Sequence, residues 1–128
     1  MNAPKQKGTR HESAVRDYLL SRGVIAYRPA QAGFADVGDI HGVSPFIIQA
    51  KDWRDLAGAL REGVDGAVKQ ARNADQDYGV AVIKRARKPV EDAYAVMRLQ
   101  DWTSVFIRLH NAEARLASID SGMVRSGW

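Results

Sequence analysis

The side chains of Glu12, Asp39, Gln49 and Lys51 are the strongest candidates for chemistry in this sequence. Gln49 and Lys51 lie inside an apolar stretch shortly after Asp39, although buried polar groups are costly unless they are paired. Mg²⁺ accepts carboxylate and amide oxygens as ligands while it keeps several waters, and a metal-bound water has a lowered pKa suited to attack on phosphorus. Lys51 would orient that water or stabilise negative charge on the phosphate. These residue types therefore predict a metal site that hydrolyses phosphodiester bonds.

Two predicted strands, residues 37–41 and 46–51, would position these groups. Because side chains alternate along a strand, Gln49 and Lys51 point to the same side of the second strand. Asp39 lies in the first strand, and the short turn between the strands brings it back beside Gln49 and Lys51. If the polar faces of the two strands coincide, a carboxylate, an amide oxygen and an ammonium group converge.

Glu12 is an independent candidate because it lies in a helix that we predict over residues 9–22. With Val15 and Leu19 it falls on one side of that helix, so its carboxylate faces the core and needs a partner. The alternative is a capping box, in which Thr9 caps the helix and Glu12 bonds back to the backbone of Thr9. The metal-linked role and the capping role are both open at this point.

The remaining pattern predicts an α/β fold in which a mixed central sheet is flanked by helices. Further strands are expected at residues 24–28, 78–84 and 93–99, a long helix through residues 55–74 after an N-cap at Asp52, and a last helix from Asp101. Glycines in the long helix indicate close packing against a sheet or a partner. A single nuclease domain is expected over residues 1–128, with a loose basic arm at residues 1–8 and a polar tail from about residue 118 to residue 128.

Composition limits the kind of metal and the kind of partner. The chain has 128 residues, a formal net charge of +4 and a sequence pI near 9.6, which suggests a polyanionic partner. It contains no cysteine, so a metal site must use oxygen or imidazole ligands, which favours Mg²⁺ or Mn²⁺. We find no apolar run long enough to span a membrane and no signal-peptide pattern. The default expectation is a cytoplasmic location, in a bacterial cell or a phage-infected host, with no membrane partner.

The segments KGTRHE, GDI and IIQAK, in that order, resemble the PD-(D/E)XK nuclease superfamily and in particular its small Holliday junction resolvases, archaeal and phage-encoded. The resemblance implies a restriction-endonuclease-like αβββαβ core. It also implies catalytic roles for Glu12 as the helix acid, Asp39 as the strand aspartate, Gln49 in place of the acid of the E-x-K element and Lys51 as its lysine. The implied metal ligands are Asp39, Gln49, Glu12 and the backbone carbonyl of Ala50, with Mg²⁺ as the cofactor and Mn²⁺ able to substitute.

Two departures from the superfamily pattern bear on this site. Gly38 stands where the pattern has proline, which removes no ligand. Gln49 ligates through an amide oxygen but removes one negative charge, and this should weaken cation binding. Asp36 is a nearby acid that would compensate, but it lies on the opposite face from Asp39 in a regular strand, so we choose Asp39.

Basic residues indicate where DNA would contact the protein. The predicted DNA-binding residues are Lys5, Lys7, Arg10, Arg54, Arg72, Lys84, Arg85, Arg87 and Lys88. Four cations fall within residues 84–88, where they repel one another unless a polyanion is bound; the alternative is a solvated turn. We expect structural or solvent-exposed positions for His11 and His41, and packing in the core for Trp53, with stacking on bases as its alternative.

A four-way junction needs two symmetric cuts and each chain carries one site, so a resolvase would act as a homodimer on branched DNA. Three alternatives remain open. The first is a nuclease for single-stranded ends, flaps or duplex DNA. The second is a DNA-binding relative that has lost catalysis, and the third is a small protein-interaction domain whose match to the superfamily pattern is due to chance.

Overall fold

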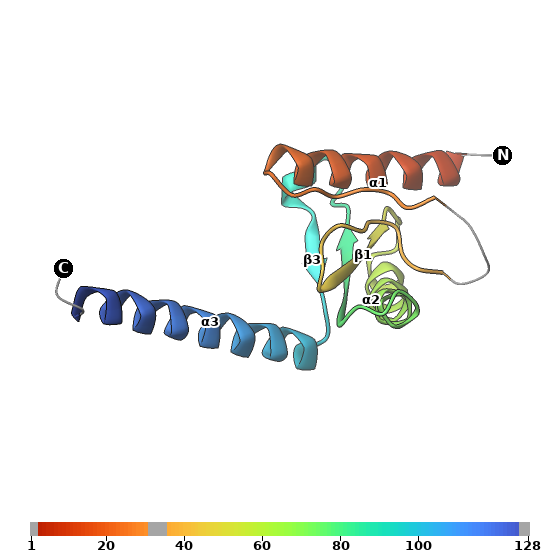
Figure 1. The fold of residues 1–128 in the computed structure, drawn as a ribbon. Helices are drawn as coiled ribbons and strands as arrows, with labels where there is room; N and C mark the ends of the chain where they lie inside the picture. The colour runs from red at the N-terminus through yellow and green to blue at the C-terminus, as the bar shows by residue number, and fades with distance from the viewer. Residues whose placement is uncertain (1–2, 31–35, 126–128) are drawn as a thin grey trace. The chain divides into compact units, whose positions relative to one another are not determined.

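The computed structural model describes residues 3–30 and 36–125, and the chain forms two compact units, Met1–Met97 and Arg98–Trp128. The first unit contains the helices α1 (Ala3–Ser21) and α2 (Leu56–Asn73), the strands β1 (Phe46–Lys51), β2 (Tyr78–Ile83) and β3 (Tyr94–Val96), and a short 3₁₀ helix, η1 (Val90–Asp92) (Figure 1). The strand order is β1-β2-β3, with β1 parallel to β2 and β2 antiparallel to β3. The predicted α/β class with a mixed sheet is confirmed.

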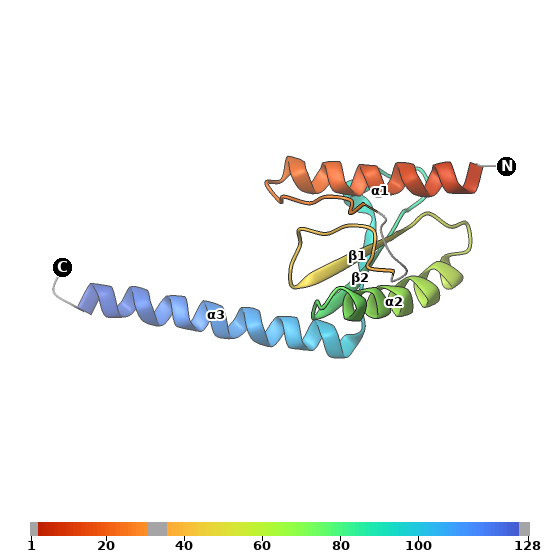
Figure 2. The same ribbon diagram turned by 45° about the vertical axis from the view of Figure 1, so that its right-hand side comes forward.

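The two long helices of this unit cover opposite faces of the sheet (Figures 1 and 2). On one face, Val15 of α1 packs in a buried cluster with Ile48 of β1. On the other face, Ala59 of α2 packs against Ala81 and Ile83 of β2. The crossover from β1 through α2 to β2 is the usual connection between parallel strands. The side chains of β1 that alternate with Ile48 therefore point toward α2.

Two predicted strands are not formed as continuous strands. In residues 24–28 and 37–41 the structure has only isolated antiparallel bridges, Tyr27 to His41 and Ile40 to Ile48. Glycines with positive φ lie on both sides of residues 39–41, at Gly38 (φ +97°) and Gly42 (φ +82°), and interrupt the extended backbone that a strand requires. Because these two segments form only isolated bridges among the described residues, the αβββαβ core that we expected stays a prediction.

The helix boundaries also differ from the prediction. Helix α1 begins at Ala3 instead of Thr9, so residues 3–8 are helical and do not form a loose arm. Pro4 does not prevent this because proline is tolerated in the first turn, where its missing N–H would have no partner in the helix. Helix α2 has its N-cap at Asp55 instead of Asp52.

The second unit consists of one helix, α3 (Leu99–Arg125). It begins before the predicted start at Asp101 and continues through residues 118–125, where we expected a polar tail. The Arg98 side chain donates two hydrogen bonds to the Asp101 carboxylate, 2.8 Å from Nε to Oδ2 and 3.2 Å from Nη2 to Oδ1, and this pair closes the first turn. The single-domain prediction over residues 1–128 stays a prediction. Within the ranges that the structure describes, no helix has the length and apolar character needed to cross a membrane.

Candidate active site on the α2 face of β1

Asp39 is fixed at the edge of β1 by backbone and side-chain hydrogen bonds. The N–H groups of Asp39 and Ile40 both donate to the carbonyl oxygen of Ile48, at 3.0 and 3.1 Å. Beyond this bridge the backbone pairing stops, and the Asp39 carboxylate takes its place: Oδ2 accepts the Ala50 N–H at 2.9 Å. Asp39 thus lies beside the stretch of β1 that carries Gln49 and Lys51, as the sequence predicts.

The Asp39 carboxyl group is electrostatically unusual. Its pKa is raised from a usual 3.8 to about 6, mainly by burial and also by the negative charges of Glu12 and Asp36, whereas the hydrogen bond from Ala50 and the charge of Lys51 oppose the shift. Glu12, Asp36 and Lys51 therefore all lie close enough to act on Asp39. A cation placed here would relieve the repulsion among these carboxylates.

Glu12 is held by an ion pair with Arg28. Its Oε2 accepts a hydrogen bond from Nη2 of Arg28 at 2.7 Å, and Nη1 of the same guanidinium donates to the Ser13 hydroxyl at 3.1 Å. Thr9 lies inside α1, not at its start, so the capping-box alternative for Glu12 is wrong. Arg28 ties α1 to the segment that precedes Asp39, with Glu12 still near enough to affect the Asp39 pKa.

Gln49 points toward α2, as alternation predicts, and ends in a small recess. Its Oε1 is buried and has no hydrogen-bond partner among the described residues. A Cβ atom on Gly66 would lie 2.4 Å from this oxygen and 3.2 Å from Cδ of Gln49, so the oxygen occupies the space that a side chain at Gly66 would fill. We call this space the Gly66 notch. A buried acceptor without a donor costs free energy, so this amide gains by binding a cation or a donor.

Lys51 lies at the end of β1, where its Nζ is 4.4 Å from the centre of the Trp53 ring. This is a cation–π contact. Trp53 is 41% exposed, so the prediction that it packs into the core is wrong. The aromatic ring instead supports the lysine whose charge acts on Asp39.

Asp36 has a different role from Asp39. Its Oδ2 accepts a hydrogen bond from Nε2 of Gln70 at 2.7 Å, its Oδ1 accepts the Gly38 N–H at 3.1 Å, and its backbone carbonyl accepts from Asn73 at 2.8 Å. Asp36 thus joins the segment before Asp39 to the end of α2. No sequence pattern indicated Gln70 and Asn73, because their role depends on how α2 lies against this segment.

The residues present fit a hard cation. Asp39, Gln49, the Ala50 carbonyl and Glu12 supply only oxygen donors, and the Gln49 oxygen is buried without a hydrogen-bond partner among the residues that the structure describes. Within the described part of the chain, no three histidine, cysteine, aspartate or glutamate side chains are grouped as a metal site. Such a site would therefore depend on the amide and carbonyl oxygens as well as on carboxylates.

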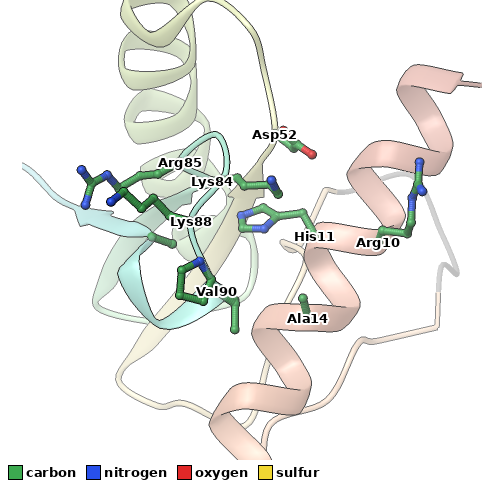
Figure 3. Close-up of a pocket in the computed structure, with 10 residues that line it drawn as sticks. Arg10, His11, Ala14, Asp52, Lys84, Arg85, Lys88 and Val90 are labelled. Atoms are coloured by element: carbon green, nitrogen blue, oxygen red, sulfur yellow. The ribbon is translucent and has the colours of Figure 1, made fainter.

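Most of the predicted DNA-binding residues line two adjoining pockets. The α1 pocket, about 460 Å³, has the polar lining residues Arg10, His11, Asp52, Lys84, Arg85 and Lys88 (Figure 3). The second, which we call the Trp53 pocket, is about 540 Å³ and is lined by Trp53, Arg54, Arg87 and Tyr94 together with Asp52, Lys84, Arg85 and Lys88. Arg72, near the end of α2, lines neither pocket, and the side chains of Lys5 and Lys7 lie outside the described residues.

Several residues of these pockets were not predicted as site residues. His11 is 3% exposed, and its Nε2 lies 3.1 Å from the carbonyl oxygen of Val82, to which it donates. Its predicted structural position is confirmed, but it also lines the α1 pocket. The guanidinium carbon of Arg85 lies 4.7 Å from the centre of the Tyr94 ring. Only the placement of α1 and β3 beside residues 84–88 reveals these neighbours.

Comparison with protein-family models gives no match, and comparisons with curated proteins and with solved structures give no significant match. The resemblance to PD-(D/E)XK nucleases therefore stays a prediction.

Proposed function

We propose that this chain is a Mg²⁺-dependent endonuclease that hydrolyses phosphodiester bonds in branched DNA, acting as a homodimer on four-way junctions in the manner of a Holliday junction resolvase. One observation carries the proposal. The partly buried Asp39 carboxylate, with its raised pKa, is held by the Ala50 N–H beside Gln49, whose buried amide oxygen has no partner among the described residues. Oxygen donors in this electrostatic setting favour a divalent cation.

In the proposed mechanism, Asp39, Gln49 and the Ala50 carbonyl would hold the cation, and the negative charge of Glu12 would help to attract it. A bound divalent cation lowers the pKa of its water and withdraws charge from a phosphate oxygen. Lys51, positioned by Trp53, orients the attacking water or neutralises charge on the phosphate in the transition state.

Gln49 contributes only after its amide changes direction. Its Oε1 now occupies the Gly66 notch without a hydrogen-bond donor among the described residues. Rotation of the terminal torsions turns this oxygen toward Asp39, which lies next to Gln49 across the bridge formed by Ile40 and Ile48. The backbone of β1 does not need to move.

The basic pockets support DNA as the substrate. Their lining is rich in lysine and arginine. Such side chains commonly contact phosphates, which would suit an enzyme that recognises the shape of a branch instead of a sequence. Two copies related by a two-fold axis would present two sites to the two strands that must be cut. A cytoplasmic location accords with this role.

The direct test is cleavage of a labelled four-way junction with Mg²⁺, with Mn²⁺ and with chelator. We expect symmetric, metal-dependent cuts that are lost in Asp39→Ala and Lys51→Ala proteins whose folding and junction binding match the wild type. Lys69→Ala removes an exposed charge from α2 and serves as the control, which should cut normally. Preference for flaps, single-stranded ends or linear duplex would replace the resolvase assignment with another nuclease.

A DNA-binding relative without catalysis is the second candidate. It is favoured by two features, the neutral side chain at Gln49 and the ion pair that engages Glu12 with Arg28. Tight junction binding with no cleavage under either metal would support it against the endonuclease.

A further inference from the structure

The α1 pocket has two chemically different parts. One part is apolar, with Ala14 from α1 and Pro89, Val90 and Ala93 from the segment around η1. The other part is polar, and in Figure 3 the side chains of His11 and Lys84 face each other across it, with Asp52 beside them. A ligand that fills the whole pocket therefore needs both an apolar surface and polar groups.

The charge of the lining favours an anion. Arg10, Lys84, Arg85 and Lys88 contribute four positive charges, and Asp52 is the one acid among the lining residues. Figure 3 shows the Lys84 ammonium group turned into the pocket, whereas the guanidinium groups of Arg10 and Arg85 point outward. A phosphate near Lys84 would thus meet one inner cation and others at the rim, an arrangement that suits a group still connected to a longer strand.

The size of the pocket favours an occupant larger than a phosphate alone. A volume of about 460 Å³ lies within the range of pockets that hold small organic ligands, roughly 300–1,000 Å³. His11 forms a rigid wall, because it is 3% exposed and its Nε2 donates to the Val82 carbonyl. A planar base against Ala14 and Val90, with its phosphate at Lys84, fills the two parts together.

We propose that the α1 pocket binds a single nucleotide unit, with the phosphate at Lys84 and the base against the apolar part. The unit comes either from a free nucleoside monophosphate or from an unpaired nucleotide in a DNA strand. None of Glu12, Asp39, Gln49 and Lys51 lines this pocket, so the binding does not require the proposed metal. The pocket residues His11 and Asp52 are chain neighbours of Glu12 and Lys51. A DNA strand bound in the pocket would therefore pass beside the candidate active site, and this placement rests on the proposed function.

The test is titration of the ¹⁵N-labelled 128-residue chain, followed by NMR with chelator present. Three small ligands are compared: deoxyadenosine monophosphate, deoxyadenosine and inorganic phosphate. We expect the monophosphate to bind at least about tenfold more tightly than either fragment and to shift the signals of His11 and Val90. Equal affinity for monophosphate and phosphate, or shifts that leave His11 unmoved, would overturn the proposal.

Two variants locate the site. Lys84→Met should weaken monophosphate binding at least about fivefold, whereas Lys69→Met removes an equal, exposed charge outside the pocket and should leave it unchanged. Ala14→Met narrows the apolar part and should weaken the monophosphate more than phosphate. The backbone spectrum of each variant must match the wild type before its affinity is compared. Equal losses in the Lys84 and Lys69 variants would show a diffuse charge effect and overturn the proposal.

Two oligonucleotides separate the sources of the nucleotide. If the unit belongs to DNA, a duplex with an unpaired extension should bind more tightly than a blunt duplex, and the monophosphate should compete with it. If the monophosphate binds in the pocket but does not compete, the site serves a free nucleotide. These binding experiments contain no divalent cation, so their results stand even if the protein proves not to be a nuclease. Conversely, if no nucleotide binds in the α1 pocket, the test of metal-dependent cleavage is not affected.

Discussion

β1 holds Gln49 and Lys51 through a six-residue parallel register with β2, whereas Asp39 is held beside them by one backbone bridge and one side-chain hydrogen bond. The first half of the candidate site therefore depends on regular sheet structure, which sets the direction of each side chain. The second half depends on the Asp39 carboxylate itself, which replaces a backbone acceptor for Ala50. The Asp39 carboxylate thus both holds residues 37–41 against β1 and supplies the proposed metal ligand.

The largest expected effect comes from separating these two roles of Asp39. Asp39→Asn keeps an oxygen that accepts the Ala50 N–H but removes the charge. We expect Mn²⁺ affinity, measured by calorimetry, to fall by more than about 100-fold, beyond the roughly 10–100-fold typical of groups that only support a ligand. Asp65→Asn, an exposed change on α2, is the matched control. Unchanged affinity in the Asp39 variant would remove Asp39 from the cation site.

The pH dependence of stability measures how strongly the fold disfavours ionised Asp39. Its folded pKa, about 6, is higher than the usual 3.8, so the folded state holds this proton more tightly than the unfolded state does. The resulting stability is full below about pH 4 and is lost as the pH rises to about 6, by roughly 1–3 kcal/mol. Urea unfolding of the metal-free wild type and of Asp39→Asn at pH 4 and pH 7 isolates this contribution. Parallel pH profiles of the two proteins would contradict it.

Gln49→Glu sharpens the comparison from the side of β1. A carboxylate at this position restores the negative charge of the E-x-K pattern that this segment resembles, so we expect Mn²⁺ to bind about tenfold more tightly. Gln100→Glu adds the same charge in the second unit and should have no such effect. If both variants gain equally, the gain reflects net charge, and Gln49 does not contact the cation.

The smallest expected effect is at the Gly66 notch. Gly66→Ala places a methyl group where the Gln49 oxygen lies, and the flexible amide yields more easily than the backbone. We expect Mn²⁺ affinity to rise about threefold while unfolding free energy changes by less than about 1 kcal/mol, because alanine also favours the helix. In a Gln49→Ala background the affinity change should disappear. An increase that persists there would assign the effect to α2 and not to Gln49.

The sequence predicted the regular half of the site well and the irregular half only in part. β1 was located to the residue because an apolar run with a clear turn before it leaves few alternatives, and alternation then gave the direction of Gln49 and Lys51. Residues 37–41 contain the same strand-forming types, but glycines with positive φ interrupt them. The predicted position of Asp39 beside β1 is correct, but Asp39 is held there partly by a hydrogen bond from the Ala50 N–H to its carboxylate, which no strand pattern indicates.

Features that depend on packing between distant elements were outside the reach of the sequence. The Gly66 notch exists because α2 crosses the sheet above Gln49, and its glycines alone indicated only that something lies close. The basic residues were found by type, but their aromatic neighbours Trp53 and Tyr94 were not assigned to them. The capping box failed because its pattern cannot show whether an earlier residue has already started the helix.

The Gln49 oxygen, which has no hydrogen-bond partner in the described part of the chain, also affects how folding and binding share free energy. A buried acceptor without a donor costs the folded state roughly 1–3 kcal/mol. A cation that engages this oxygen recovers that cost, so part of the binding free energy is stability that the metal-free protein lacks. Under the proposed function, the metal-free protein is less stable because of Gln49, and the same oxygen then strengthens cation binding at the position where the E-x-K pattern has an acid.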